Sequence, residues 1–98
     1  MAMCRGRLGG ETRLRSADIP IAELRAFSAV VEHGGFSRAA EALAISQPTV
    51  SLRLQSLEEH LGLRLLDRRS GVTLTEPGRE LYNRARQILT QIDQFDAT

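Results

Sequence analysis

The most constraining feature of the sequence is a single apolar stripe within residues 47–61. Its members recur at i, i+4, i+7 and i+11, namely Val50, Leu54, Leu57 and Leu61. At about 100° per residue, this spacing keeps them on one side of an α-helix. Ser46 is placed as the N-cap, Pro48 is tolerated in the first turn, and Gly62 stops the helix. The sequence therefore predicts a helix with one buried face and one free face.

The face opposite this stripe is polar but uncharged at its N-terminal end. The outward positions are Pro48, Leu52, Gln55 and Glu59, with Gln47, Thr49, Ser51 and Ser56 on the flanks. Carboxylates are confined to the other end of the helix, at Glu58 and Glu59. A face that only meets solvent usually carries Lys, Glu and Arg. Uncharged hydrogen-bonding groups at a helix N-terminus fit instead a helix that enters a DNA major groove N-terminus first.

Two shorter helices are predicted before this one. The first, over about 21–33, has an apolar stripe at Leu24, Phe27, Val30 and Val31 and a glycine stop after His33. Ser37 is placed as the N-cap of a second helix over about 38–44, whose alanines let another helix approach closely. Two short helices joined by a tight turn make a helix-turn-helix. From spacing alone, the alternative is a helical protein-interaction domain.

Two short strands and a long helix are predicted after residue 61. Leu65 and Leu66, then Val72 and Leu74, read as strands joined by an arginine-bearing turn, which adds a wing to the helix-turn-helix. The last helix, about 76–96, carries a heptad seam at Leu81, Ala85, Ile88, Ile92 and Phe95. At about 30 Å it is as long as a small domain is wide, so we expect a second copy to cover the seam. The alternative is a helix that lies across its own domain.

The expected organisation is a mainly α fold in three parts. Residues 1–18 hold four arginines, three glycines and no apolar run, so we expect a disordered leader or a cloning remnant. Residues 19–75 form the winged helix-turn-helix and residues 76–98 a dimerising linker helix. No apolar run approaches the roughly 18 residues of a membrane span, so we expect a soluble, cytoplasmic protein.

The overall charge and the reactive side chains give little support to a polyanion partner, a metal site or catalysis. Net charge is +1 overall, and residues 19–98 hold nine arginines and ten carboxylates, so bulk charge does not indicate a polyanion partner. The lone Cys4 excludes a disulfide framework and a cysteine-rich zinc site. His33 and His60 have neither a nucleophile nor metal-ligand spacing nearby. We therefore expect no enzyme, metal or cofactor.

Four motifs in order carry a resemblance to a known family: "GFSRAAEAL", "SQPTVS", "LEEHLGLRLLDR" and "LTEPG". From about Glu23 to Leu89 the chain resembles the N-terminal DNA-binding domain of LysR-type transcriptional regulators. The resemblance implies a winged helix-turn-helix with a dimerising linker helix. It also implies binding to interrupted palindromes of double-stranded DNA, as a tetramer in a full-length parent. A small-molecule effector would act only through a separate C-terminal domain, so we expect a chain ending at Thr98 to be an excised fragment or a natural short form.

The resemblance also implies roles for single side chains. Gln47 matches the family's base-reading glutamine, whose amide can donate to and accept from an adenine edge. The other expected base contacts are Pro48, Thr49, Ser51, Leu52 and Gln55. The expected contacts with the DNA backbone are Ser37, Arg38, Ser46 and Arg53. Leu52 stands where the family often has arginine and Arg53 where it often has glutamine, so we expect Leu52 to meet a thymine methyl.

The wing and the overall charge leave alternatives open. Arg68 and Arg69 are expected near a narrow minor groove, which attracts arginine by its deepened negative potential. The alternative is a salt bridge to Asp67 or to the leader. The competing function is a winged-helix protein-interaction module that does not bind DNA, suggested by the near-neutral charge and by Leu52.

Overall fold

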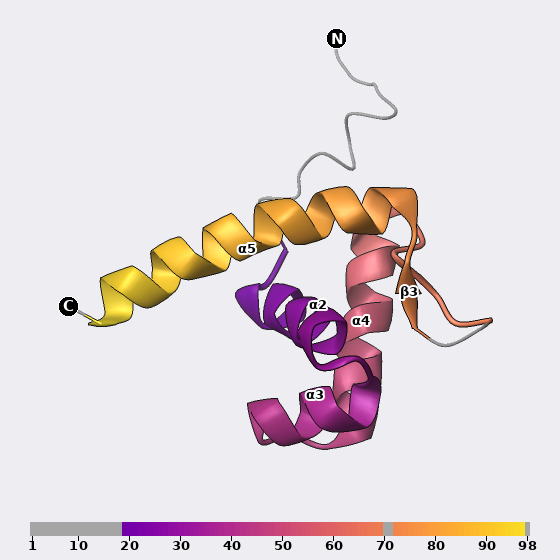
Figure 1. Ribbon diagram of the computed structural model, residues 1–98, viewed down its shortest axis with the longest axis horizontal. Helices are drawn as coiled ribbons and strands as arrows, with labels where there is room; N and C mark the ends of the chain where they lie inside the picture. The colour runs from indigo at the N-terminus through magenta and orange to yellow at the C-terminus, as the bar shows by residue number, and fades with distance from the viewer. Residues whose placement is uncertain (1–18, 70–71, 98) are drawn as a thin grey trace, which may run out of the picture.

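The computed structural model describes residues 19–69 and 72–97, which form four helices and a two-stranded sheet (Figure 1). In chain order these are α2 (Ile21–His33), α3 (Phe36–Leu43), α4 (Gln47–Leu61), β2 (Leu66–Asp67), β3 (Thr73–Leu74) and α5 (Glu76–Ala97). The predicted order and type of the elements are confirmed. The expected leader, residues 1–18, and the wing tip at 70–71 lie outside the described residues.

The α4 helix begins and ends where its sequence predicts. The Ser46 side chain accepts a hydrogen bond from the Thr49 backbone N–H at 3.2 Å. At the other end, Gly62 adopts a left-handed φ of 67° and its N–H donates to the Glu58 carbonyl oxygen at 2.8 Å. These caps satisfy backbone groups that a helix leaves unpaired at its ends. The start of α4 is therefore fixed at Gln47.

The α3 helix begins earlier than predicted. Gly35 is its N-cap, and Ser37 lies inside the first turn, so the assignment of Ser37 as a cap is wrong. Phe36 packs against the hydrophobic core, which favours helix formation from that residue onward. The turn to α4 uses Ala44 at a left-handed φ of 60°, and this tight turn holds α3 against α4.

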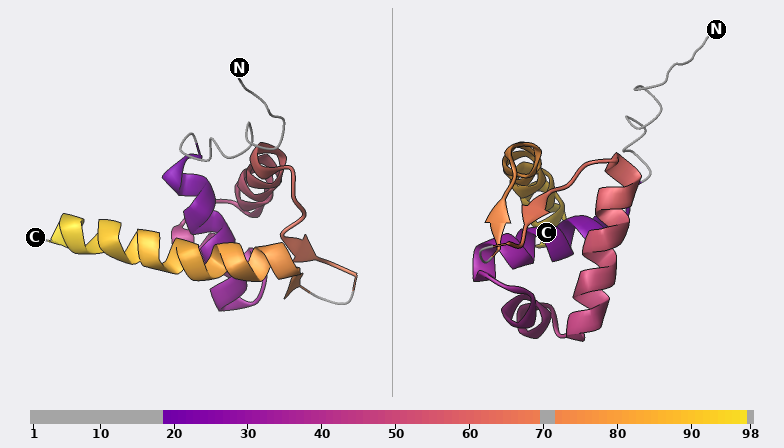
Figure 2. Two further views of the ribbon diagram at one scale, coloured as in Figure 1. Left: turned by 90° about the horizontal axis from the view of Figure 1, so that it is seen from above. Right: turned by 90° about the vertical axis from the view of Figure 1, so that its right-hand side faces the viewer.

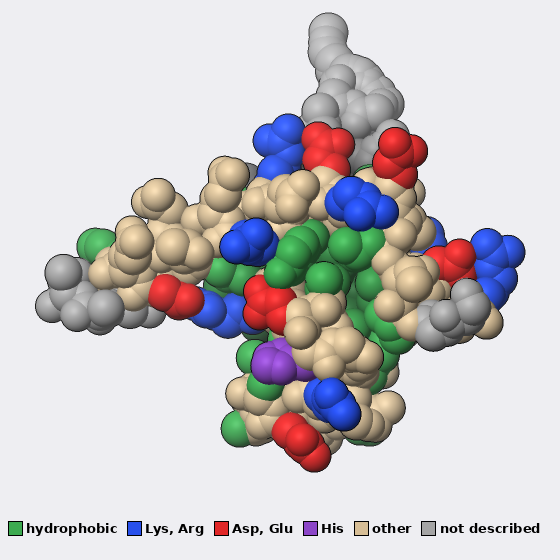
Figure 3. Space-filling model, in the orientation of Figure 1, with side chains coloured by type: hydrophobic (Ala, Val, Ile, Leu, Met, Phe, Trp, Pro, Cys, Tyr) green, Lys and Arg blue, Asp and Glu red, His purple; other side chains and the backbone are tan. Residues whose placement is uncertain are grey.

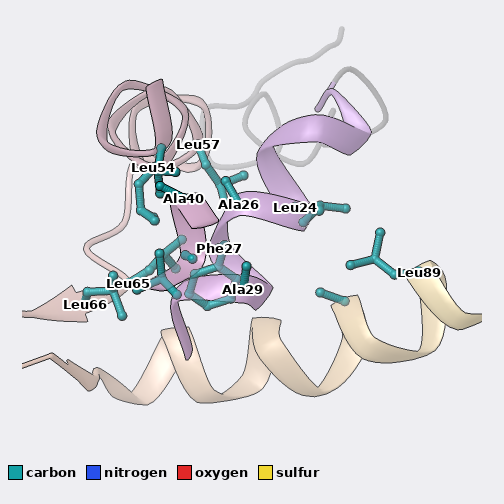
Figure 4. Close-up of a cluster of buried hydrophobic side chains, with 14 residues drawn as sticks. Leu24, Ala26, Phe27, Ala29, Ala40, Leu54, Leu57, Leu65, Leu66 and Leu89 are labelled. Carbon is teal, nitrogen blue, oxygen red and sulfur yellow. The ribbon is translucent and has the colours of Figure 1, made fainter. Parts of the chain in front are cut away.

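The hydrophobic core is centred on α2, which packs against α3, α4 and α5. The largest fully buried side chains are Phe27, Leu54, Leu57, Leu65, Leu66, Val30 and Val50. Figure 4 shows Leu54 and Leu57 of α4 facing Ala26 of α2, and Leu24 of α2 facing Leu89 of α5. Three members of the predicted α4 stripe are thus fully buried, and Leu61 is half-buried. The predicted orientation of α4 is confirmed.

The wing is an antiparallel pair of two-residue strands. Leu66 pairs with Leu74, and Asp67 pairs with Thr73. Leu65 precedes the first strand and is buried, and its carbonyl oxygen accepts a hydrogen bond from Thr75 N–H at 3.0 Å. The wing therefore returns the chain to the core just before α5 begins. Figure 2 shows it projecting from one end of the molecule.

The α5 helix lies across its own domain in its first half and extends beyond it in its second (Figure 1). Ala85 is fully buried and Leu89 is 8% exposed, both in the core of their own subunit. The assignment of Ala85 to an intersubunit seam is therefore wrong, and the half-buried Leu81, also assigned to that seam, packs against the core of its own subunit as well. The four-residue steps from Leu81 to Ala85 and Leu89 turn one stripe toward α2. Ile88, 43% exposed, lies on a neighbouring stripe that its own subunit leaves open.

Polar contacts also attach α5 to α2. The Tyr82 hydroxyl donates to Glu32 Oε2 at 3.1 Å, and burial raises the pKa of Tyr82. Further along α5, Asp93 forms an ion pair with Arg25 of α2 at 2.9 Å. Figure 3 shows hydrophobic side chains gathered between α5 and the helices below it. Across residues 19–69 and 72–97, no helix combines the length and the apolar character that crossing a membrane requires.

Candidate nucleic-acid interface

The exposed side of α4 consists of Gln47, Pro48, Ser51, Leu52 and Gln55, which we call the α4 outer face. Gln47, Pro48 and Gln55 are exposed, Leu52 is 65% exposed, and Ser51 is half-buried. Thr49 is half-buried at the edge of this face. The buried stripe behind it packs into the core, so the orientation of the face is set by the fold. A hydrogen-bonding surface on a fixed helix N-terminus is thus available to a ligand.

Two serines expected at the DNA backbone have partners within the domain. Ser46 caps α4, and its Oγ also lies 2.8 Å from Thr49 Oγ1. Ser37 Oγ donates to the Gln47 side-chain oxygen Oε1 at 2.9 Å. Both pairs lie at the N-terminus of α4 and order the side chains there. Arg38 is exposed in the first turn of α3 and Arg53 is half-buried on α4, where their contacts with DNA stay predictions.

The two wing arginines also contact their own chain. Arg69 binds Asp67 with two side-chain hydrogen bonds, Nε to Oδ1 at 3.2 Å and Nη2 to Oδ2 at 3.0 Å. These hydrogen bonds lower the pKa of Asp67 from 3.8 to about 2. Arg68 lies over the Phe36 ring, with its guanidinium carbon 4.9 Å from the ring centroid. The structure thus shows the alternative expected for Arg69, an ion pair with Asp67.

Glu58 attaches the wing to α4, a role that the sequence did not reveal. Its Oε2 accepts hydrogen bonds from the backbone N–H groups of Leu65 and Leu66, at 2.8 and 3.3 Å. No local pattern marks this contact, because a helical glutamate near a C-terminus reads as an ordinary surface charge. The contact fixes where the chain leaves α4 and enters β2.

We expect Glu58→Ala to destabilise the domain by about 1–3 kcal/mol, because it leaves two part-buried amides without their acceptor. The neighbouring change Glu59→Ala is the matched control, since Glu59 is exposed and contacts Gln55 on its own helix at 3.5 Å. Urea denaturation of both variants measures the difference. Equal stability of the two would show that the Glu58 contact does not hold the wing.

In the part of the chain that the structure describes, no group of three or more His, Cys, Asp or Glu side chains is placed to hold a metal ion. His60 Nδ1 lies 3.0 Å from Oε1 of the buried Glu23, a contact that joins the end of α4 to α2. His60 thus has a structural partner.

A buried helix-turn-helix core, an exposed polar face on its second helix and an antiparallel wing define the winged helix-turn-helix class of DNA-binding proteins. Within that class, the family model described as "Bacterial regulatory helix-turn-helix protein, lysR family" matches residues 21–79. The chain belongs to the LysR family of bacterial transcriptional regulators.

Named relatives agree with this family. BenM of Acinetobacter baylyi, a transcriptional regulator, is 45% identical over 74% of this chain and 24% of its own length. The RuBisCO operon transcriptional regulator of Allochromatium vinosum is 44% identical over 71% of this chain and 24% of its own. The chain thus spans about a quarter of the length of these relatives.

Solved structures match the fold as well. The BenM DNA-binding domain in complex with catB site 1 DNA has a TM-score of 0.76 and 42% identity, and the match covers 80% of this chain and 89% of that one. A Corynebacterium glutamicum OxyR mutant has a TM-score of 0.78 and 35% identity, over 81% of this chain and 26% of that chain. The fold therefore follows the family's DNA-binding domain over about four fifths of the chain.

Proposed function

We propose that this chain binds double-stranded DNA sequence-specifically, as the DNA-binding domain of a LysR-type transcriptional regulator. The observation that carries the proposal is the exposed, uncharged N-terminal half of the α4 outer face, backed by fully buried Val50, Leu54 and Leu57. The BenM domain, which resembles this chain over most of its length, is solved with DNA from two sites. That likeness favours DNA binding over a protein-interaction module.

In the proposed complex the N-terminus of α4 enters the major groove. Gln47 lies at the first helical position, where its amide can reach a base edge. Pro48 and Thr49 offer apolar surface, Ser51 offers a hydroxyl group, and Gln55 lies one turn further along the same face. The exposed Leu52 offers a branched apolar surface that suits a thymine methyl group. Bases are therefore read by hydrogen bonds and by apolar contact together.

Arginines at the edges of this face would hold the DNA backbone. Arg38 is exposed on α3, Arg53 is half-buried on α4, and the exposed Ser46 caps α4. Arg68 and Arg69 would approach a minor groove from the wing. Because Arg69 is paired with Asp67, a contact with the minor groove would compete with this ion pair. The contacts with phosphate position the domain and do not read sequence, whereas arginine in a minor groove responds to its width.

A second copy would complete the binding unit. On α5, Ile88 and Phe95 are 43% and 81% exposed, and Ile92 is half-buried. Paired linker helices would separate two α4 helices for successive major grooves about 34 Å apart, which suits an interrupted palindrome.

A tetramer and control by a small-molecule effector would belong to a full-length parent. A chromosomal ligand implies a cytoplasmic protein.

A salt titration of DNA binding tests the proposed function. If the protein neutralises Z phosphates, the logarithm of its affinity falls with the logarithm of salt concentration at a slope of about −0.9Z. We expect a clearly negative slope for this chain, measured by gel shift on duplexes selected from a random pool. A flat response would contradict DNA binding and would favour the interaction module.

A further inference from the structure

The segment that joins α4 to the wing must cross one strand of DNA in the proposed complex. A single sugar-phosphate strand separates a major groove from the minor groove beside it. If α4 lies in the major groove and the wing in the minor groove, residues 62–65 lie over that strand. Within this segment Leu65 is buried in the core, and the one charged side chain, Arg64, is exposed. Arg64 is therefore placed to meet a phosphate between the two grooves.

Arg64 shares its surroundings with Arg68 of the wing. Both side chains line a hollow of about 500 Å³ together with Ser51 and Gln55 of the α4 outer face. Both also line a second hollow, of about 460 Å³, together with Arg69. Arg64 and Arg68, which we call the arginine pair, thus lie together between the α4 outer face and the rest of the wing.

The acidic side chains around the arginine pair have other partners. Among the described residues, neither member of the pair forms an ion pair with a carboxylate. Asp67 is bound by Arg69. Glu58 and Glu59 also line the hollow beside α4, where Glu58 accepts two backbone hydrogen bonds and Glu59 contacts Gln55. The two positive charges are therefore available to an anion from outside this domain.

The structure also holds the arginine pair in place. The backbone carbonyl oxygen of Arg64 accepts a hydrogen bond from Thr75 Oγ1 at 2.6 Å, which attaches this segment to the residue before α5. The guanidinium carbon of Arg68 lies 4.9 Å from the centroid of the Phe36 ring, a cation–π contact with α3. A cation that is already positioned loses less conformational freedom when it binds a phosphate.

We propose that Arg64 and Arg68 bind phosphates of the DNA strand that separates the major groove at α4 from the minor groove at the wing. This proposal rests on the proposed function and adds Arg64, to which the sequence gave no role. It also moves Arg68 from the minor groove to the strand beside it, and leaves that groove to Arg69. Guanidinium groups bind phosphate oxygens by charge-assisted, often bidentate hydrogen bonds. Phe36 is a positioning residue, because its ring holds Arg68.

Salt titrations of Arg64→Gln and Arg68→Gln test the proposal, by gel shift on a selected duplex and on random duplex. Each phosphate contact contributes about −0.9 to the slope of log affinity against log salt. We expect either change to make the slope less steep by about 0.9 for each bound copy of the chain. Affinity should fall about 10-fold on both kinds of duplex, because phosphate contacts do not read sequence.

Two variants serve as controls for these titrations. Arg64→Lys keeps the positive charge and should keep the slope. Arg86→Gln removes another arginine that lies over an aromatic ring, that of Tyr82 at 5.9 Å. Arg86 belongs to α5, which lies at the opposite end of the domain from the N-terminus of α4 (Figure 1). We expect Arg86→Gln to leave both the slope and the affinity unchanged.

A double-mutant cycle tests the role of Phe36. Phe36→Leu keeps an apolar side chain against the core and removes the ring beneath Arg68. We expect it to lower affinity about 2- to 5-fold in the wild type, the range of an exposed cation–π contact, and to cause no further loss in Arg68→Gln. Equal losses in both backgrounds would mean that Phe36 acts only through packing, and would overturn its positioning role.

Other outcomes overturn the phosphate contacts themselves. An unchanged slope in Arg64→Gln and Arg68→Gln, or an equal change in Arg86→Gln, would show that the arginine pair does not bind phosphate. A loss confined to duplexes with an A·T-rich, narrow minor groove would place Arg68 in that groove. Loss of the slope in Arg64→Lys as well would show that the charge is not its source. A wild-type chain that binds DNA without a salt slope would instead remove the proposed function, and this proposal with it.

Discussion

Replacing Gly78 by alanine is expected to destabilise the domain by about 3 kcal/mol, the upper end of the usual cost of overpacking. A Cβ atom at this position would overlap the backbone carbonyl oxygen of Leu65 and come within 3.1 Å of Thr75 Oγ1. The Leu65 carbonyl is backbone and already accepts from Thr75 N–H, so it cannot move aside without breaking that hydrogen bond. The change would push the start of α5 away from the wing.

Two other glycines provide matched controls for this prediction. A Cβ atom at Gly35 would meet nothing within 4 Å, so Gly35→Ala should cost at most about 1 kcal/mol, because alanine is a poorer N-cap than glycine. Gly34 also has open space, but its φ of 79° is left-handed, so Gly34→Ala should cost about 1 kcal/mol. Thermal or urea unfolding of the three alanine variants ranks them. A Gly78 variant as stable as the Gly35 variant would refute the close approach of α5 to Leu65.

Introducing charge at Ile88 and Ile92 of α5 is expected to separate the proposed dimer. The double change Ile88→Glu with Ile92→Glu would place two carboxylates where two apolar surfaces meet. A monomer can hold only one half-site, so affinity for an interrupted palindrome should fall about 10²- to 10⁴-fold. Sedimentation measures the oligomeric state, and the same samples give the affinity.

The matched control for this double change carries the same charges at the same spacing on another side of α5. Asn83→Glu with Gln87→Glu alters two exposed positions four residues apart. We expect this control to remain dimeric and to bind the palindrome with an affinity close to that of the wild type. If dimers survive the isoleucine changes, or dissociate equally in both variants, the proposed dimer contact through Ile88 and Ile92 is contradicted.

The parts of the fold that depend on local periodicity could be predicted from sequence. The stripe from Val50 to Leu61, the Ser46 cap and the Gly62 stop are encoded within one helix, and each is confirmed. These features alone orient the α4 outer face. Because the exposed side of a helix follows once its buried side is known, helical periodicity was enough to place Gln47 and Leu52 on the surface.

The contacts that depend on tertiary packing could not be predicted in the same way. Ala85 fits a heptad, but the position of α2 beneath α5 buries it in its own subunit. Glu58 reaches amides seven and eight residues away, and Ser37 reaches Gln47 across a turn. Helical periodicity describes which residues share a face. It does not say what lies opposite that face.

The central claim is that Gln47, on the α4 outer face, reads a base. The most direct test compares the affinities of the wild type, Gln47→Ala and the distant amide control Asn83→Ala for a selected site and for random duplex, at one salt concentration. We predict that Gln47→Ala loses about 1–3 kcal/mol on the selected site and almost nothing on random DNA, whereas Asn83→Ala loses neither. Equal losses on both kinds of DNA, or no loss on the selected site, would contradict the claim.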